Sequence, residues 1–242
     1  PNDSRNIRKV FVGPLIGIHC KMKNIRNLLF DLDGTLVDSS LTISACIDYA
    51  LDRLEILNAG NSPVTTVIGT PLLDIFRKHY EMTDEQAEAA IAHYREHYDR
   101  LAQAGSQVYD RVPEVLSTLQ NEGFRLFIAT VKPTSIAEKV LSDLDLRCYF
   151  DGIAGASMSH ERRDKASIIA YALQKFDLDP MQSLMIGDRD QDIIGARENG
   201  LPCIAVTYGF GSRDELNSAR PDHVAGHSEE IISLLMNPSM AE

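Results

Sequence analysis

Residues 25–39 read IRNLLFDLDGTLVDS, and this stretch decides the fold. It begins with an apolar run, Ile25 to Phe30, that stops at two acids and Gly34. A short apolar run that ends in acids and glycine is typical of a buried strand followed by a tight turn. We therefore expect a strand over 25–30 that presents Asp31 and Asp33 at its carboxyl end.

The chain beyond residue 106 alternates between helical and strand patterns. The spacing of apolar residues predicts helices at 112–122, 134–144, 164–176 and 190–199, and strands at 125–130, 151–155, 183–187 and 203–207. Alternating units of this length need crossover connections, which produce a mostly parallel sheet with helices on both faces. The predicted fold class is therefore α/β, with a Rossmann-like parallel sheet as its core.

The segment between the first predicted strand and residue 106 has a different pattern. Helix-period segments occupy 41–57, 71–80 and 83–104, and Ser39 and Ser40 precede the first of them as possible caps. We expect residues 41–105 to form an inserted helical domain, called here the helical insert. The core domain then comprises 25–40 and 106–242, and residues 1–24 form an N-terminal tail or extra strand.

Composition and charge narrow the classes of partner. The chain of 242 residues has a formal net charge of -11 and a pI near 5.1, so nucleic acid polymers and anionic membranes would repel it. Its four cysteines are scattered, without the spacing of a disulfide framework or a zinc site. No apolar run reaches the roughly 18 residues of a membrane span. We expect a cytoplasmic monomer or homodimer that acts on a small molecule.

Residues whose side chains can react or bind a metal stand at the ends of several predicted strands. In parallel α/β sheets the site forms outside the carboxyl ends of the strands, and the groups expected there are Asp31, Asp33, Thr130, Lys165, Asp188 and Asp192. Carboxylates about 4 Å apart repel by roughly 4 kcal/mol at an effective dielectric near 20. A hard dication relieves this repulsion, and Mg2+ suits a site of few carboxylates with waters and a phosphate oxygen. The acid cluster therefore predicts a magnesium site.

The same residues fit phosphoryl transfer, in which catalysis is largely placement and stabilisation of charge on the phosphoryl oxygens. Lys165, the Thr130 hydroxyl and backbone N–H groups of the Gly34 turn would surround the phosphoryl group, opposite the metal. One carboxylate can act as nucleophile and another as general acid and base. We assign these roles to Asp31 and Asp33 respectively.

The motifs resemble those of the haloacid dehalogenase superfamily in its phosphatase form. Residues 31–39 resemble the first motif, Thr130 the second, Lys165 the third and residues 187–192 the fourth. The resemblance implies a Rossmann-like core with a mobile helical cap, which is the helical insert. It also implies that Asp31 is the nucleophile, that Asp33 is the acid and base and lends its carbonyl to Mg2+, that Asp188 is a direct ligand, and that Asp192 supports the metal indirectly, through water or Lys165.

A closer resemblance is to the phosphoglycolate phosphatase branch and its 5′-nucleotidase-like relatives. It rests on residues 129–133 (ATVKP), Arg189 and residues 208–211 (YGFG). Most relatives have Asn or Ser where Val131 stands, so this chain lacks a polar side chain beside the phosphate and keeps only the backbone N–H. Lys132 adds positive charge at the entrance. We therefore include both residues in the predicted substrate site.

Other functions remain open on the sequence alone. A phosphosugar mutase uses the same scaffold, a phosphorylation-dependent receiver combines a similar acid cluster with Thr and Lys, and a silent binding module needs no turnover. The helical insert argues against a receiver, because closure over the site serves a hydrolase that must control water.

Two segments of the helical insert have both a structural and a functional interpretation. Residues 69–71 (GTP) form either a specificity loop or an ordinary helix start. Arg77, Lys78, His79 and Arg95 either meet the far end of the substrate or belong to a solvated helix face, and the solvated face is the favoured interpretation.

Overall fold

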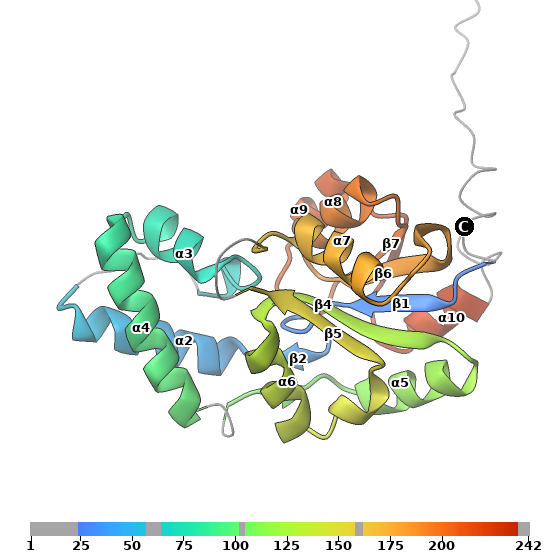
Figure 1. Ribbon diagram of the computed structural model, residues 1–242, viewed down its shortest axis with the longest axis horizontal. Helices are drawn as coiled ribbons and strands as arrows, with labels where there is room; N and C mark the ends of the chain where they lie inside the picture. The colour runs from blue at the N-terminus through green and yellow to red at the C-terminus, as the bar shows by residue number, and fades with distance from the viewer. Residues whose placement is uncertain (1–23, 57–63, 102–104, 158–161, 237–242) are drawn as a thin grey trace, which may run out of the picture.

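The computed structural model describes residues 24–56, 64–101, 105–157 and 162–236 (Figure 1). Within them a six-stranded sheet has the order β5-β4-β1-β6-β7-β8, and every neighbouring pair in it is parallel. Its strands are β1 (Asn27–Phe30), β4 (Arg125–Pro133), β5 (Gly152–Ala156), β6 (Ser183–Gly187), β7 (Cys203–Val206) and β8 (His223–Ala225). β1 pairs with β4 on one side and with β6 on the other, so it lies in the interior of the sheet.

Helices cover both faces of this sheet, as Figure 1 shows. One face packs against α5 (Val112–Asn121), α6 (Thr134–Asp143) and α10 (Glu230–Met236). The other packs against α7 (Lys165–Lys175), α8 (Asp190–Glu198) and α9 (Arg213–Ala219). Short 3-10 turns stand at Arg147–Tyr149 and Pro180–Gln182. The predicted α/β fold class with a Rossmann-like core is confirmed.

The helical insert contains two long helices that pack against each other, α2 (Ser40–Arg53) and α4 (Asp84–Leu101). Thr83 and Gln86 form a capping box before α4: each residue's N–H donates to the other's side chain, at 3.0 and 3.3 Å. A 3-10 turn (Val64–Thr66) and α3 (Leu72–Asp74) lie between the two helices.

The expected helix at 71–80 differs in form from the prediction. After α3 the chain widens into a π-helical turn (Ile75–His79), in which the Tyr80 N–H donates to the Ile75 carbonyl at 3.3 Å. This turn buries Ile75 and Phe76. The periodicity of apolar residues does not distinguish an α-helical turn from a π-helical turn.

The two chain passages that join the helical insert to the core lie side by side. β2 (Val37–Asp38) pairs with β3 (Gln107–Val108) as an antiparallel ladder. The boundaries of the insert at 41 and 105 remain a prediction. The predicted N-terminal tail lies outside the described residues, apart from Asn24. No helix in the described part of the chain is long and apolar enough to cross a membrane.

The centre of the sheet should carry much of the stability. Leu28 is 0% exposed and stands in register with Leu126 and Leu184 on the neighbouring strands. We expect Leu28→Ala to lower the free energy of unfolding by about 2–5 kcal/mol, because a cavity forms in a site that cannot collapse. Leu41→Ala, at a leucine that is 68% exposed, should change it by about 0.5 kcal/mol or less. Urea denaturation of both variants measures the difference, and equal losses would contradict this account.

Candidate active site

The ammonium of Lys165 joins three parts of the site. Its Nζ lies 2.9 Å from Asp31 Oδ1 and 2.7 Å from Asp192 Oδ1, and it donates to the Ala129 carbonyl at 3.0 Å. Asp31 follows β1, Ala129 belongs to β4, and Asp192 lies in the first turn of α8. The Asp164 side chain caps α7 by accepting from the Ser167 N–H, which fixes Lys165 as the first residue of that helix. The predicted meeting of Asp31 and Lys165 is therefore present in the structure.

Asp188 is fully buried beside the turn that follows β1. Its Oδ1 accepts from the Thr35 hydroxyl at 3.0 Å, and its Oδ2 accepts from the Phe210 N–H at 2.8 Å. Gly34 has a φ of +89°, and a Cβ at this position would overlap the Asp188 carboxylate. The conformation and the close approach both require glycine at position 34.

Burial and mutual repulsion shift the pKa values of these groups. Burial, together with the charge of Asp192, raises the pKa of Asp31 to about 6, although Lys165 lowers it. Burial and the charges of Asp192 and Asp31 hold the pKa of Asp188 well above its usual range. Burial alone lowers the pKa of Lys165, but Asp192 and Asp31 outweigh it and raise that pKa. The cluster therefore holds more negative charge than one lysine balances.

The donor set suits a hard divalent cation. Asp31, Asp188 and Asp192 are all buried, and each offers a carboxylate oxygen within 4.8 Å of the others'. Three carboxylates that share one ammonium favour an oxygen-preferring dication such as Mg2+. The Asp33 carboxylate is not part of this group, and the carbonyl that Asp33 is expected to lend to Mg2+ remains a prediction. Asp192, expected to support the metal through water or Lys165, lies within the group and contacts Lys165.

Asp33 instead pairs with Lys132 on the side of the helical insert. Lys132 Nζ lies 2.8 Å from Asp33 Oδ2 and donates to the Tyr98 hydroxyl of α4 at 3.3 Å. Burial lowers the pKa of Lys132, but the charge of Asp33 outweighs it and raises that pKa. The sequence analysis expected Lys132 to add positive charge at the entrance, whereas its ion pair with Asp33 and its contact with Tyr98 were not predicted.

The remaining predicted substrate residues lie close to this pair. Thr130 is buried, and its hydroxyl accepts from the Lys132 N–H at 3.3 Å, at the register shift between Thr130 and Pro133 in β4. The Gly34 N–H donates to the Val37 carbonyl at 2.8 Å, so this amide is already used within the turn. A phosphate contact by Gly34 remains a prediction, as do the substrate roles of Thr130 and Val131.

Arg189 makes a connection that the sequence analysis missed. Its Nε donates to Glu215 at 2.7 Å, its NH1 donates to the Ile68 carbonyl and its NH2 to the Thr66 carbonyl at 3.3 Å. Its backbone N–H also donates to Asp192 at 3.0 Å. One arginine beside the acid cluster thus holds a loop of the helical insert. The only sequence signal was the Arg189 side chain within the fourth motif.

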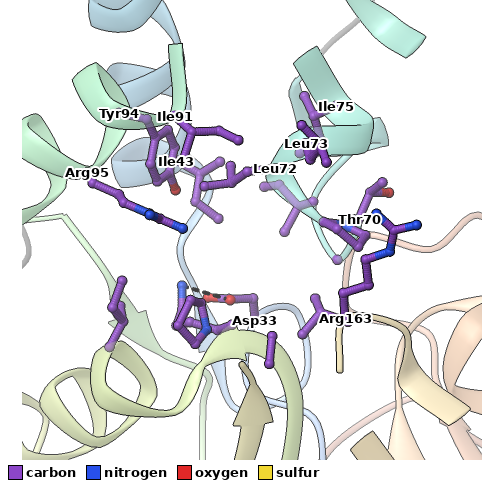
Figure 2. Close-up of a pocket in the computed structure, with 18 of the residues that line it drawn as sticks. Asp33, Ile43, Thr70, Leu72, Leu73, Ile75, Ile91, Tyr94, Arg95 and Arg163 are labelled. Atoms are coloured by element: carbon purple, nitrogen blue, oxygen red, sulfur yellow. Dashed lines mark ion pairs between the residues drawn. The ribbon is translucent and has the colours of Figure 1, made fainter. Parts of the chain in front are cut away.

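A cleft opens between the acids and the helical insert, and Figure 2 shows it. It encloses about 920 Å³ of space, part of it open to solvent. The core contributes Asp33, Lys132 and Val131, and the insert contributes residues 68–73 with Ile75, Tyr94 and Arg95, among others. Residues 69–71 therefore line the cleft. The favoured interpretation of Arg95 as a solvated residue is wrong, because it is half-buried in this cleft, whereas Arg77 is exposed and pairs with Asp84.

Comparison with known proteins identifies the family of the chain. Residues 28–206 match the model of the haloacid dehalogenase-like hydrolase family, so the chain belongs to that family. The resemblance inferred from the sequence motifs is confirmed.

Individual relatives place the chain among the phosphatases of the family. It is 38% identical to a 5′-nucleotidase of Pseudomonas aeruginosa over 81% of this chain and 89% of the relative. It is 30% identical to a phosphoglycolate phosphatase of Yersinia pseudotuberculosis over 92% of this chain and 98% of the relative. The structure of a predicted phosphatase from Clostridium acetobutylicum superposes with a TM-score of 0.83 at 36% identity, covering 88% of this chain and 98% of that one.

The close approach of Gly34 to Asp188 can be tested with a matched glycine. Gly123 has nearly the same φ, +86°, but a Cβ there meets nothing within 4 Å. We expect Gly123→Ala to cost about 1–2 kcal/mol of stability through its backbone alone. Gly34→Ala should cost about 1–3 kcal/mol more, because the added methyl displaces the Asp188 carboxylate. Denaturant unfolding of the two variants measures the difference, and equal costs would show that the contact with Asp188 carries no energy.

Proposed function

We propose that this phosphatase hydrolyses a small phosphomonoester in two steps, with Mg2+ bound by Asp31, Asp188 and Asp192. The observation that carries the proposal is the buried group of three carboxylates around Lys165, next to an open cleft. Bound Mg2+ supplies positive charge that stabilises the phosphoryl oxygens. The helical insert acts as the cap over this site, and the scattered cysteines favour the cytoplasm.

In the first step an Asp31 oxygen attacks phosphorus and the bond from phosphorus to the ester oxygen breaks. Lys165 and the Leu32 N–H, at 2.8 Å, both contact Asp31 Oδ1. This leaves Oδ2 without a hydrogen bond from the described residues, so it is free to form the aspartyl phosphate. Asp33 donates a proton to the leaving alcohol oxygen.

In the second step water attacks the phosphorus of the aspartyl phosphate. Asp33 accepts the proton from the water, inorganic phosphate leaves, and the Asp31 carboxylate is restored. Asp33 lines the cleft, and its Oδ1 has no hydrogen-bond partner among the described residues, which suits a group that exchanges protons with substrate and water. Thr130 and Lys165 would hold the phosphoryl oxygens.

The sequence resemblance favours a phosphoglycolate phosphatase-like reaction, with nucleoside 5′-monophosphates as the alternative substrates. The relatives described above bear both names. Either substrate is a small phosphate ester, and the chemistry at Asp31 is the same for both.

The nucleophile assignment is tested by phosphate release. We expect Asp33→Asn to lower kcat by about 10²–10⁴, and Asp31→Asn to lower it at least as much, because no acceptor for the phosphoryl group remains. Asp190→Asn is the control: Asp190 opens α8 close to Asp192 but is not part of the three-acid group. Near-wild-type turnover by Asp31→Asn would overturn the mechanism. No release from any ester by the wild-type protein would favour a receiver or a silent binding module.

Magnesium binding should weaken as pH falls through about 6. The Asp31 carboxyl, with its raised pKa of about 6, is protonated below that pH in the metal-free protein and must release its proton to bind Mg2+. We expect the apparent affinity to fall by up to about tenfold per pH unit per proton. Titration of Tm with Mg2+ at pH 7.5 and pH 5.5 measures this change.

The stability of the metal-free protein should change with pH in the opposite direction to its affinity for Mg2+. Between the unfolded pKa of 3.8 and the folded value of about 6, the folded chain binds more protons at Asp31 than the unfolded chain. When a chelator removes the metal, the contribution of Asp31 to the free energy of unfolding therefore decreases as pH rises across this window. A Mg2+-induced shift of Tm that is the same at both pH values would contradict a metal site at Asp31.

A further inference from the structure

Arg189 links the acid cluster to one wall of the cleft. Its guanidinium donates to the carbonyls of Thr66 and Ile68, which belong to the loop of residues 64–71 that precedes α3, called here the docking loop. Residues 68–73 line the cleft and form one of its walls in Figure 2. The arginine contact therefore bears on where this wall stands relative to the core.

The core holds the Arg189 side chain in place. Its Nε donates to Glu215 Oε1 at 2.7 Å, and the same oxygen accepts from the Asp190 N–H at 3.1 Å. Arg189 is 8% exposed, and a Cβ at Gly69 would lie 3.2 Å from its Cγ. The docking loop thus packs against a buried arginine whose three side-chain nitrogens all have acceptors.

The backbone of Arg189 belongs to the acid cluster. It directly follows Asp188, and its N–H donates to Asp192 Oδ2 at 3.0 Å. Both acids are members of the group of three carboxylates, which share the single ammonium of Lys165. Neutralising the excess negative charge removes the repulsion across residues 188–192. The same residues aim the guanidinium at the docking loop, so charge at the acids and the position of the loop are mechanically connected.

Burial of Ile68 gives the docking loop a second anchor. Ile68 is 1% exposed and packs in the apolar core. An apolar contact does not respond to the charge at the acids, whereas the contact made by Arg189 does, because its backbone lies between two of them. A dependence on Mg2+ therefore distinguishes the two anchors.

We propose that Arg189 couples metal binding to the docking loop, so that Mg2+ at the three carboxylates fixes one wall of the cleft. This inference rests on the magnesium site of the proposed function, and it adds a positioning residue that makes the shape of the cleft depend on the metal. Arg189 is not among the residues that line the cleft, so it acts through the docking loop rather than on the substrate.

Hydrogen exchange in the docking loop measures the coupling. The N–H groups of Val67 and Thr70 donate to the carbonyls of Val64 and Val67, both at 3.0 Å, so their exchange is slow when the loop is formed. In wild type we expect saturating Mg2+ to slow this exchange at least about fivefold relative to chelator. In Arg189→Gln the exchange should be fast in both conditions and differ by less than about twofold between them.

Arg197→Gln is the matched control. Arg197 lies on the same helix, and its NH2 donates to the carbonyls of Ala219 and Arg220 at 2.6 and 2.8 Å, both within the core. This variant should keep the wild-type response of the docking loop to Mg2+. Arg189→Lys keeps the charge but not the planar arrangement of donors, so it should recover only part of that response.

The affinity for Mg2+ provides the reciprocal measurement, because linkage requires it to change by the same factor as docking. Titration of Tm with Mg2+ should give a Kd at least about fivefold weaker for Arg189→Gln than for wild type. If Arg189→Gln does not fold, Arg189→Lys is compared with wild type in both measurements, with a smaller change in the same direction expected.

The possible failures are distinguishable. If Mg2+ binds wild type and variant equally and the docking loop of both responds alike, the coupling is wrong and the proposed function stands. Exchange that rises equally over the whole chain in Arg189→Gln would also overturn the coupling, because it would show a general loss of stability. If Mg2+ does not bind the wild-type protein, the magnesium site of the proposed function fails, and the coupling fails with it.

Discussion

The site depends on one buried ammonium. Lys165 Nζ contacts Asp31, Asp192 and the Ala129 carbonyl, all within 3.0 Å, and the side chains of Lys165, Asp31 and Asp192 are buried. Removing one partner from a buried charge cluster costs about 3–5 kcal/mol, because the remaining charges stay desolvated. The position of Lys165 at the start of α7 therefore determines how closely β1, β4 and the beginning of α8 approach one another. The charge that Lys165 does not balance makes the same cluster suitable for a dication.

The sequence predicted those site residues whose positions follow from the alternation of strands and helices in a parallel sheet. Asp31, Lys165, Asp188 and Asp192 each follow a predicted strand or begin a predicted helix, and in a parallel sheet those positions meet at one edge. The order of the strands was not needed for this conclusion. The α/β class followed from the same alternation of strand and helix, whereas the π-helical turn after α3 and the short β2–β3 ladder were not predicted, because neither has a distinct periodicity.

Contacts between the helical insert and the core could not be predicted in the same way. Arg189 reaches the carbonyls of Thr66 and Ile68, more than 120 residues earlier in the chain, and Lys132 reaches the Tyr98 hydroxyl. Backbone carbonyls are present at every residue, so no residue type marks them as partners. The Lys132 side chain ties the insert to Asp33, and Arg189 ties it to Asp192, because its side chain holds the insert while its backbone N–H donates to Asp192. The position of the insert and the geometry of the acids therefore depend on each other.

The division between chemistry and recognition also explains why the substrate was hard to read from the sequence. The reacting groups are acids and a lysine on the core, whereas the cleft walls come from ordinary helical faces of the insert. Ile91, Tyr94, Arg95 and Tyr98 follow the i, i+3, i+4, i+7 spacing of an apolar stripe, and such a stripe normally packs into a core. Here Ile91, Tyr94 and Tyr98 pack into the core and also line the edge of the cleft, and a charged residue stands within the stripe. An arginine inside an apolar stripe must bury its guanidinium beside an acceptor or leave a donor unpaired, so Arg95 was the position in α4 where the sequence itself departed from the pattern of a packing face.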